Sequence, residues 1–138
     1  MDGRHEFRAG RHVVFSLHVH LVFITKYRRG VITEQVRSEL EQSFRKVCGD
    51  FESELLDLDG QDDHVHLLVA YPPKVALSRL VNSLKGVSAR RIRALELPEI
   101  RDKLWGPSLW SPSYCAVSCG GAPLDTIKRY IQDQRRSA

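Results

Sequence analysis

Residues Asp63–Val69 have the sequence DHVHLLV. It is an apolar run with β-branched residues, which predicts a strand. Side chains in a strand alternate between two faces, so His64 and His66 point the same way, roughly 7 Å apart. The intervening apolar residues take the other face and fill a core. Two imidazoles side by side on a rigid strand are half of a metal site.

The sequence just before and after this stretch extends it into a hairpin. Residues 51–59 are predicted to form a strand, and residues 60–63 have the composition of a turn. We therefore expect antiparallel strands at 51–59 and 64–71, with Pro72-Pro73 ending the second one.

A long strand is also predicted nearer the N-terminus, at residues 12–26. Its odd-numbered residues from 13 to 23 are all apolar, and its other face carries His18 and His20. This is a second His-Val-His, so histidine spacing alone does not single out His64 and His66. Such a pair, taken alone, is more often structural than metal-binding.

Helical periodicity appears in two further segments. Apolar residues at helical spacing predict one helix at 33–49, capped by Thr33, and another at 75–97, stopped by Pro98. An irregular aromatic loop is expected over residues 99–113.

The remaining residues supply a last strand and a last helix. A short strand is predicted at 114–118, and Pro123 can begin a helix running to about Gln134. The order strand, helix, strand, strand, helix, strand is that of the split βαβ, ferredoxin-like fold. We expect an α+β protein with a four-stranded antiparallel sheet, two helices on one face and an extra C-terminal helix.

Length and composition fit a single globular domain. The chain has 138 residues, of which 42% are hydrophobic and 28% charged. Residues 1–11 are polar and basic and are predicted to be a flexible N-terminal arm, so the domain would span 12–138. Lys and Arg outnumber Asp and Glu by 21 to 17, a mild excess that permits nucleic acid as a partner without requiring it.

Cysteine content and hydropathy suggest a cellular location. Three cysteines, an odd number, argue against a disulfide framework and for a reducing cytoplasm. No apolar run is long enough for a membrane span, so a cytoplasmic protein without a membrane partner is expected.

Several short motifs together carry a resemblance to one family. They lie between residues 18 and 135, and in chain order they are Lys26-Tyr27-Arg28-Arg29, residues 63–68 with Pro72-Pro73, Leu84-Lys85-Gly86, Leu109-Trp110-Ser111, Tyr114, and Tyr130-Ile131 with Gln134. No single motif is specific, but the joint pattern resembles the single-tyrosine HUH transposases of the insertion-sequence two-hundred/six-hundred-and-five family.

The resemblance implies a role for each of four residues. His64 and His66 would be the metal-binding histidines, Tyr130 the nucleophile, and Gln134 the third protein ligand. His20 has a counterpart in the family pattern, but not as a ligand. Tyr130 and Gln134 are four apart and share one helical face. Without the resemblance, Tyr130 would be more typical of a packing residue.

The implied activity is DNA transposition by cleavage and joining of single strands. The substrate would be single-stranded DNA with a hairpin at each insertion-sequence end, and tyrosine attack would leave a covalent 5′-phosphotyrosine link. Two histidines favour Mn²⁺ as the divalent ion, whereas cellular abundance favours Mg²⁺. The phosphodiester energy is retained in the link, which agrees with the lack of a phosphate-binding Gly-x-x-x-x-Gly-Lys loop and of a nucleotide cofactor. One tyrosine cannot hold two cut ends, so a homodimer is expected.

Basic residues are the candidate contacts to DNA phosphates, and Tyr27 could stack on a base. Each of them is as typical of a solvated surface as of a DNA contact. They are Lys26, Arg28, Arg29, Lys85, Arg90, Arg91 and Arg93.

Two other classes of function stay open. A ferredoxin-like sheet with basic loops also describes a non-catalytic module that binds nucleic-acid hairpins, although RNA-recognition domains display aromatics where this sheet shows histidines. A metal-dependent hydrolase could use the histidine pair to activate water, with Asp62 and Asp63 close by, but it would lack further carboxylate ligands. A rolling-circle initiator shares the histidines and the tyrosine, but such chains are usually longer.

Overall fold

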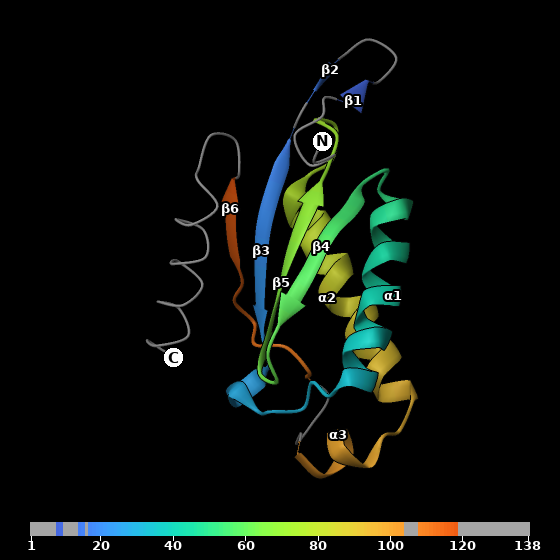
Figure 1. Cartoon of the computed structure of the whole chain (residues 1–138), viewed down its shortest axis with the longest axis vertical. Coiled ribbons are helices and arrows are strands. Elements are labelled where there is room, and N and C mark those ends of the chain that lie inside the picture. The colour runs from blue at the N-terminus through green and yellow to red at the C-terminus, as the bar shows by residue number, and fades with distance from the viewer. Residues whose placement is uncertain (1–7, 10–13, 16, 104–107, 119–138) are drawn as a thin grey trace.

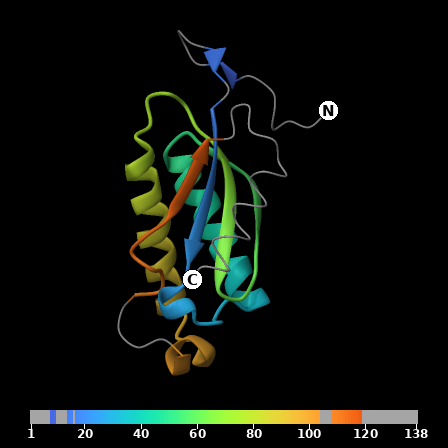
Figure 2. The same cartoon turned by 90° about the vertical axis from the view of Figure 1, so that its left-hand side faces the viewer.

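A four-stranded antiparallel sheet with two helices against one face forms the centre of the molecule (Figures 1 and 2). The computed structural model describes residues 8–9, 14–15, 17–103 and 108–118. The elements of this centre are β3 (His18–Ile24), α1 (Glu34–Asp50), β4 (Glu54–Gly60), β5 (His64–Ala70), α2 (Leu77–Ala94) and β6 (Cys115–Ser118).

The order of strands across the sheet is β4-β5-β3-β6, and every neighbouring pair is antiparallel. Helix α1 joins β3 to β4, and β5 fills the place between them. Helix α2 joins β5 to β6, and β3 fills the place between those. Two interleaved βαβ units of this kind confirm the predicted α+β, ferredoxin-like architecture.

Three smaller elements lie outside this frame. They are the paired strands β1 (Arg8–Ala9) and β2 (Val14–Phe15), the short 3₁₀ turn at Lys26–Arg28, and α3 (Pro98–Lys103). Strand β1 falls within the segment predicted as an N-terminal arm. The part of the chain that the structure describes contains no helix long and apolar enough to cross a membrane.

Several predicted boundaries were wrong. The strand expected over 51–59 begins only at Glu54, because Phe51 is the C-cap of α1. The strand expected over 12–26 is interrupted, because Leu17 is outside any strand and the chain turns after Ile24 into the 3₁₀ segment. The aromatic loop expected over 99–113 contains α3, which begins at Pro98. Proline is well suited to a first helical turn, where its missing N–H has no intrahelical partner, so Pro98 begins α3. Helix α2 has already ended at Ala94, with Leu95 as its C-cap, and not at Pro98 as predicted. The helix predicted at 123–134 lies outside the described residues.

The register of the sheet decides which side chains enter the core. In β3 and β5, Val22 is paired with His66 and Ile24 with His64. The residues between them point to the helices and are fully buried, as are the apolar residues of α1 and α2 that meet them. In β4 a bulge between Leu55 and Asp57 changes the alternation, so that Leu55 and Leu58 are both buried.

Helix α1 begins where the sequence predicts. The Thr33 hydroxyl accepts a hydrogen bond from the Val36 amide at 3.2 Å, which satisfies one of the unpaired N–H groups of the first turn. Further along α1, the Phe44 ring meets Phe23 of β3 edge to face, with 6.0 Å between ring centroids. The Phe23 ring also packs on Trp110, at 5.7 Å.

A buried hydrogen bond joins the 108–114 loop to α2. The Trp110 indole Nε1–H donates to the Ser88 hydroxyl at 3.0 Å, and that hydroxyl donates to the Lys85 carbonyl at 3.1 Å. Ser88 is completely buried and Trp110 nearly so. The loop that leads into β6 therefore sits against α2 through both apolar packing and a satisfied polar contact.

We predict that Ser88→Ala lowers the free energy of unfolding by about 1–3 kcal/mol, because the buried indole N–H loses its partner. In a Trp110→Phe background the same change should cost clearly less, since no donor is left unpaired. Denaturant titration of the two single variants and the double variant measures the coupling. Strictly additive effects would contradict the assigned hydrogen bond.

The imidazole of His20 is the most buried histidine side chain of the sheet, with 6% of the residue exposed. Its Nε2 is buried and has no hydrogen-bond partner among the residues that the structure describes. Burial, reinforced by the nearby His66, lowers the pKa of His20 from 6.5 to about 4. The folded protein therefore holds this imidazole neutral at a pH where the unfolded chain would protonate it.

The sign of the resulting pH dependence follows from this lowered pKa. Because only the unfolded state takes up the proton between pH 6.5 and 4, stability is full above pH 6.5 and falls as the pH drops. Between pH 7.5 and pH 4.5 the wild type loses unfolding free energy because of His20. We predict that this loss is smaller by about 2–3 kcal/mol in His20→Leu. Urea titrations of both proteins at the two pH values test this, and parallel pH profiles would show that His20 contributes nothing.

Candidate functional site

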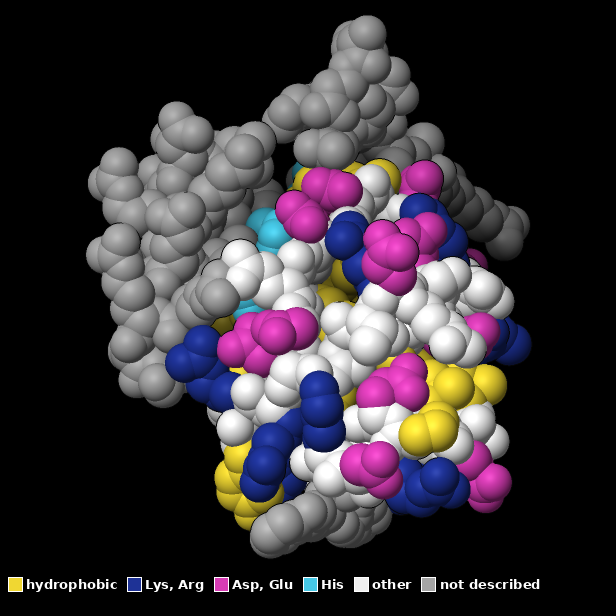
Figure 3. All heavy atoms as spheres, turned by 60° about the horizontal axis from the view of Figure 1, so that its bottom comes forward, with side chains coloured by type: hydrophobic (Ala, Val, Ile, Leu, Met, Phe, Trp, Pro, Cys, Tyr) yellow, Lys and Arg dark blue, Asp and Glu magenta, His cyan; other side chains and the backbone are white. Residues whose placement is uncertain are grey.

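Both histidines of the 64–66 stretch lie on the sheet face opposite α1 and α2. His64 is buried and His66 is half-buried, with 22% of its side chain exposed. The strand order places β5 between β3 and β4, so neither imidazole lies at an edge of the sheet. Figure 3 shows histidine side chains that reach the molecular surface, with acidic side chains close to them.

The second His-Val-His pair, on β3, shares this face but is displaced along it. His18 is paired with Ala70 and His20 with Leu68, at the far end of β5 from His64. The His20 ring stacks on the His66 ring, with centroids 5.0 Å apart and planes 23° apart. One histidine of the second pair therefore packs directly against the candidate ligand His66.

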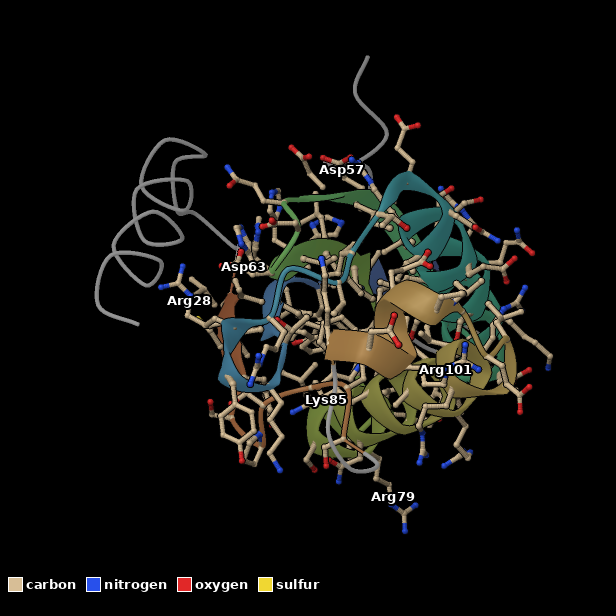
Figure 4. All side chains as sticks on the ribbon, turned by 90° about the horizontal axis from the view of Figure 1, so that it is seen from below. Arg28, Asp57, Asp63, Arg79, Lys85 and Arg101 are labelled. Atoms are coloured by element: carbon tan, nitrogen blue, oxygen red, sulfur yellow. The ribbon has the colours of Figure 1, made fainter. Side chains whose placement is uncertain are left out.

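A hydrogen-bonded chain of three residues holds His64. The Asp63 carboxylate oxygen Oδ1 lies 2.8 Å from His64 Nδ1. Its Oδ2 accepts hydrogen bonds from Arg28 Nε at 3.2 Å and Arg28 Nη2 at 3.0 Å. Figure 4 shows Arg28 and Asp63 close together at this end of the sheet. Burial opposes ionisation of Asp63, but the hydrogen bonds from His64 and Arg28 prevail and hold its pKa below the usual value.

His66 has a looser acidic neighbour. Its Nε2 lies 3.7 Å from Asp59 Oδ2, which is beyond hydrogen-bonding distance. The other oxygen of Asp59 accepts the Gly60 amide at 2.8 Å and lies 3.6 Å from Arg37 Nη2. Burial lowers the pKa of His66, with Asp59 working in the opposite direction.

The donor set on the described residues fits part of a divalent metal site. Two neutral imidazoles are good ligands for such an ion, and a carboxylate on the second ring nitrogen, as at His64, is the usual support of a metal-binding histidine. Among the described residues no group of three or more His, Cys, Asp or Glu could hold an ion by itself. A third protein ligand would have to come from another residue type or another segment. Gln134 and Tyr130, the predicted ligand and nucleophile, lie outside the described residues.

The predicted DNA contacts fall into two groups, one after the end of β3 and one on α2. The first group consists of the 3₁₀ turn Lys26–Arg28 beside Asp63 and of Arg29, which follows it. In this turn Tyr27 is 72% exposed, and Lys26 Nζ lies 5.4 Å from the centre of its ring. The other group belongs to α2, in the helical layer that covers the opposite face; it consists of Lys85, Arg90, Arg91 and Arg93. The structure therefore brings only the first group close to His64.

Two cations of the α2 group have partners within the protein. Lys85 Nζ donates to the carbonyls of Ser111 at 2.7 Å and Ser113 at 3.2 Å, and burial lowers its pKa. Arg91 donates to Glu39 and to Gln42, at 2.8 Å in each case. Arg90 and Arg93 are exposed. Phosphate binding by these residues stays a prediction.

The sequence indicated the two imidazoles but not the residues around them. Neither the contact of Asp63 with both His64 and Arg28 nor the stacking of His20 on His66 was predicted. The one available signal was the acidic residue directly before the His-Val-His. On a regular strand such a residue would point to the opposite face, but Asp63 precedes the first residue of β5 and its side chain turns to His64.

The amino-acid sequence matches known transposases over most of its length. Residues 13–134 match the family model described as Transposase IS200 like. The ISDra2 transposase TnpA of Deinococcus radiodurans is 36% identical over 129 residues, covering 94% of this chain and 91% of that protein. The transposase for insertion sequence element IS200 of Salmonella typhimurium is 28% identical over 123 residues, covering 89% of this chain and 80% of that protein.

Solved structures give the same result. A crystal structure from Deinococcus radiodurans R1, described as a candidate transposase, has a TM-score of 0.73 and 34% identity, covering 92% of this chain and 97% of that one. A REP-associated tyrosine transposase bound to a REP hairpin has a TM-score of 0.56 and 14% identity, covering 89% of this chain and 67% of that one, a likeness of fold alone. With a family model spanning residues 13–134 and a relative 36% identical over nearly the whole chain, this protein belongs to the IS200-like transposase family.

Proposed function

We propose that this transposase cleaves and rejoins single-stranded DNA at hairpin-bearing insertion-sequence ends through a covalent 5′-phosphotyrosine. The observation that carries the proposal is the pair of imidazoles of His64 and His66 on one face of β5, in a chain of the IS200-like family. A neighbour that shares the fold is bound to a REP hairpin, which is compatible with a hairpin ligand here.

Tyr130 is the proposed nucleophile. Its phenol oxygen attacks the scissile phosphorus, the bond from phosphorus to the 3′ oxygen breaks, and the phenol proton is lost. The departing oxygen takes up a proton and becomes a free 3′-hydroxyl, while the 5′ phosphate stays on the tyrosine. In the joining step a 3′-hydroxyl attacks this phosphate and releases the tyrosine. Because one phosphodiester is exchanged for another, no nucleotide cofactor is needed.

His64, His66 and Gln134 are proposed to hold a divalent ion, Mg²⁺ or Mn²⁺. When bound, such an ion supplies positive charge to a phosphate oxygen as negative charge develops in the displacement. The part of the two imidazoles is to bind through neutral ring nitrogens, and at His66 burial lowers the pKa and so favours that neutral form.

Contacts to DNA are proposed mainly from the turn beside the histidines. Lys26 and Arg29 would bind phosphates of the strand being cut, and the exposed Tyr27 ring could stack on a base. The exposed Arg90 and Arg93 of α2 are candidates for more distant phosphates. Two DNA ends must be held at once, and each chain offers a single proposed nucleophile, so a homodimer is the proposed active form.

We predict that Tyr130→Phe abolishes the covalent protein–DNA adduct, because phenylalanine lacks the attacking oxygen. The assay mixes protein, Mn²⁺ and a labelled single-stranded oligonucleotide spanning a hairpin at an end of the element, and resolves the products on a denaturing gel. Tyr71→Phe and Tyr114→Phe are matched controls that should keep the adduct. An adduct that persists in Tyr130→Phe would show that the nucleophile is assigned wrongly. Hairpin binding by the wild type without any adduct would favour the non-catalytic module.

We also predict that His64→Ala or His66→Ala lowers the rate of adduct formation by at least about 100-fold at limiting Mn²⁺, since each removes a proposed ligand. Hairpin affinity in a gel-shift assay should change much less. His18→Ala belongs to the other His-Val-His and should leave the rate close to wild type. Equal losses of adduct-forming rate in His18→Ala and His64→Ala would contradict the assignment of the metal to His64 and His66. An unchanged rate in the presence of a chelator would exclude a metal requirement.

A further inference from the structure

The Asp63 side chain uses both carboxylate oxygens to connect a turn of the protein to His64. Oδ1 is at 2.8 Å from His64 Nδ1, and Oδ2 accepts two N–H groups of Arg28, at 3.0 and 3.2 Å. Asp63 and His64 are both buried, with 8% and 7% of each residue exposed. A carboxylate can only accept hydrogen bonds, so the neutral imidazole must carry its proton on Nδ1. The Nε2 lone pair is then the one available to an ion.

The position of Arg28 is itself held firmly. Tyr27 and Arg28 both have positive φ angles, 59° and 52°, in the left-handed region that non-glycine residues seldom adopt. The turn is fastened at Thr25, whose amide donates to the Asp63 carbonyl at 3.0 Å and whose hydroxyl donates to the Arg29 carbonyl at 2.7 Å. Thr25 is completely buried. The hydrogen bonds of Thr25 hold Tyr27 and Arg28 in this unfavourable backbone conformation, in which the Arg28 side chain lies against Asp63.

The other histidine lacks this support. Asp59 lies 3.7 Å from His66, is 61% exposed at its side chain, and accepts a backbone amide with its other oxygen. No hydrogen bond therefore fixes the tautomer of His66 from that side. The two imidazoles of the pair are chemically alike but differ in how firmly their protons are placed.

We propose that Asp63 and Arg28 are positioning residues that hold His64 as the Nδ1–H tautomer and make it the preorganised ligand of the pair. The inference rests on the proposed metal-binding role of His64. It assigns Arg28 a role distinct from the phosphate contact that the sequence suggested. Asp63 and Arg28 act on the site through His64.

The variant Asp63→Asn is the sharpest test because it keeps the size of the side chain. Its amide oxygen would stay on Arg28, so its NH₂ group would face His64 Nδ1 and donate to it. The imidazole proton is then driven to Nε2, where the ion should bind. Asp59→Asn makes the same chemical change beside His66, where no hydrogen bond is present, and is the matched control.

The primary readout is the tautomer of His64 in metal-free protein at pH 8. Long-range ¹H–¹⁵N spectra of ¹⁵N-histidine-labelled protein distinguish the two tautomers, and the His64→Gln variant assigns the signal. We expect the Nδ1–H form to predominate in the wild type and in Asp59→Asn, and the Nε2–H form in Asp63→Asn. An unchanged tautomer in Asp63→Asn, or a wild-type His64 in the Nε2–H form, would overturn the proposal.

The second readout is Mn²⁺ affinity, from the electron paramagnetic resonance signal of the free ion during a titration. We expect Asp63→Asn to bind Mn²⁺ about 10- to 100-fold more weakly, Asp63→Glu to recover part of the loss, and Asp59→Asn to change little. Because both readouts are made without DNA, they separate this inference from the proposed function. A tautomer shift with weaker Mn²⁺ binding in a protein that forms no adduct would leave the positioning role intact and remove the transposition chemistry. If the wild type forms the adduct but Asp63→Asn binds Mn²⁺ as tightly as the wild type, the transposition chemistry would stand and the positioning role would be excluded.

Arg28→Gln tests the other end of the chain. It should weaken Mn²⁺ binding while leaving the salt dependence of single-stranded DNA binding unchanged. A lost phosphate contact would instead reduce the slope of log affinity against log salt by about 0.7. That smaller slope, with wild-type Mn²⁺ affinity, would contradict the positioning role and return Arg28 to the group of DNA contacts.

Discussion

The register of β5 between β3 and β4 is the constraint on which the site depends. Val65, Leu67 and Val69 are almost completely buried against the helices, and their burial decides which way the strand faces. Since side chains alternate with a period of two, a slip of one residue would send both imidazoles into the core and three apolar side chains out of it. The orientation of His64 and His66 is therefore a consequence of hydrophobic packing on the opposite face, without any requirement for a bound ion.

The strand register orients both imidazoles but does not fix the tautomer of either. At the end of the sheet, the hydrogen bond between Asp63 and His64 Nδ1 fixes the tautomer of His64. There the Ile24 carbonyl accepts the Ser111 amide at 2.7 Å, and Thr25 ties the following turn to Asp63. Three segments far apart in the chain thus meet beside His64. The site is asymmetric as a result, with one imidazole held by a buried carboxylate and the other bounded by the His20 ring and an exposed carboxylate.

Features that arise from local periodicity could be predicted from the sequence, and features that arise from meetings between segments could not. The alternation in residues 64–70 predicted a strand of the sheet and the shared face of the two histidines. The capping residue Thr33 predicted the start of α1. The contact between Arg28 and Asp63 joins residues 35 positions apart, and Tyr27 and Arg28 both have positive φ angles. Neither feature can be predicted from a local sequence pattern. The bulge in β4 between Leu55 and Asp57 was likewise not predicted from the local sequence. The roles of Tyr130 and Gln134 came from the family resemblance and stay predictions, because both residues lie outside the described part of the chain.

The sheet presents two imidazoles on one face, and both are proposed to bind one divalent ion. Electron spin-echo modulation of Mn²⁺ bound to the protein counts the imidazole nitrogens on the ion directly. With saturating protein, the account predicts modulation from two imidazoles in the wild type, from one in His64→Gln or His66→Gln, and from two in His18→Gln. Bound Mn²⁺ without imidazole modulation, or a count that neither His64→Gln nor His66→Gln alters, would contradict it.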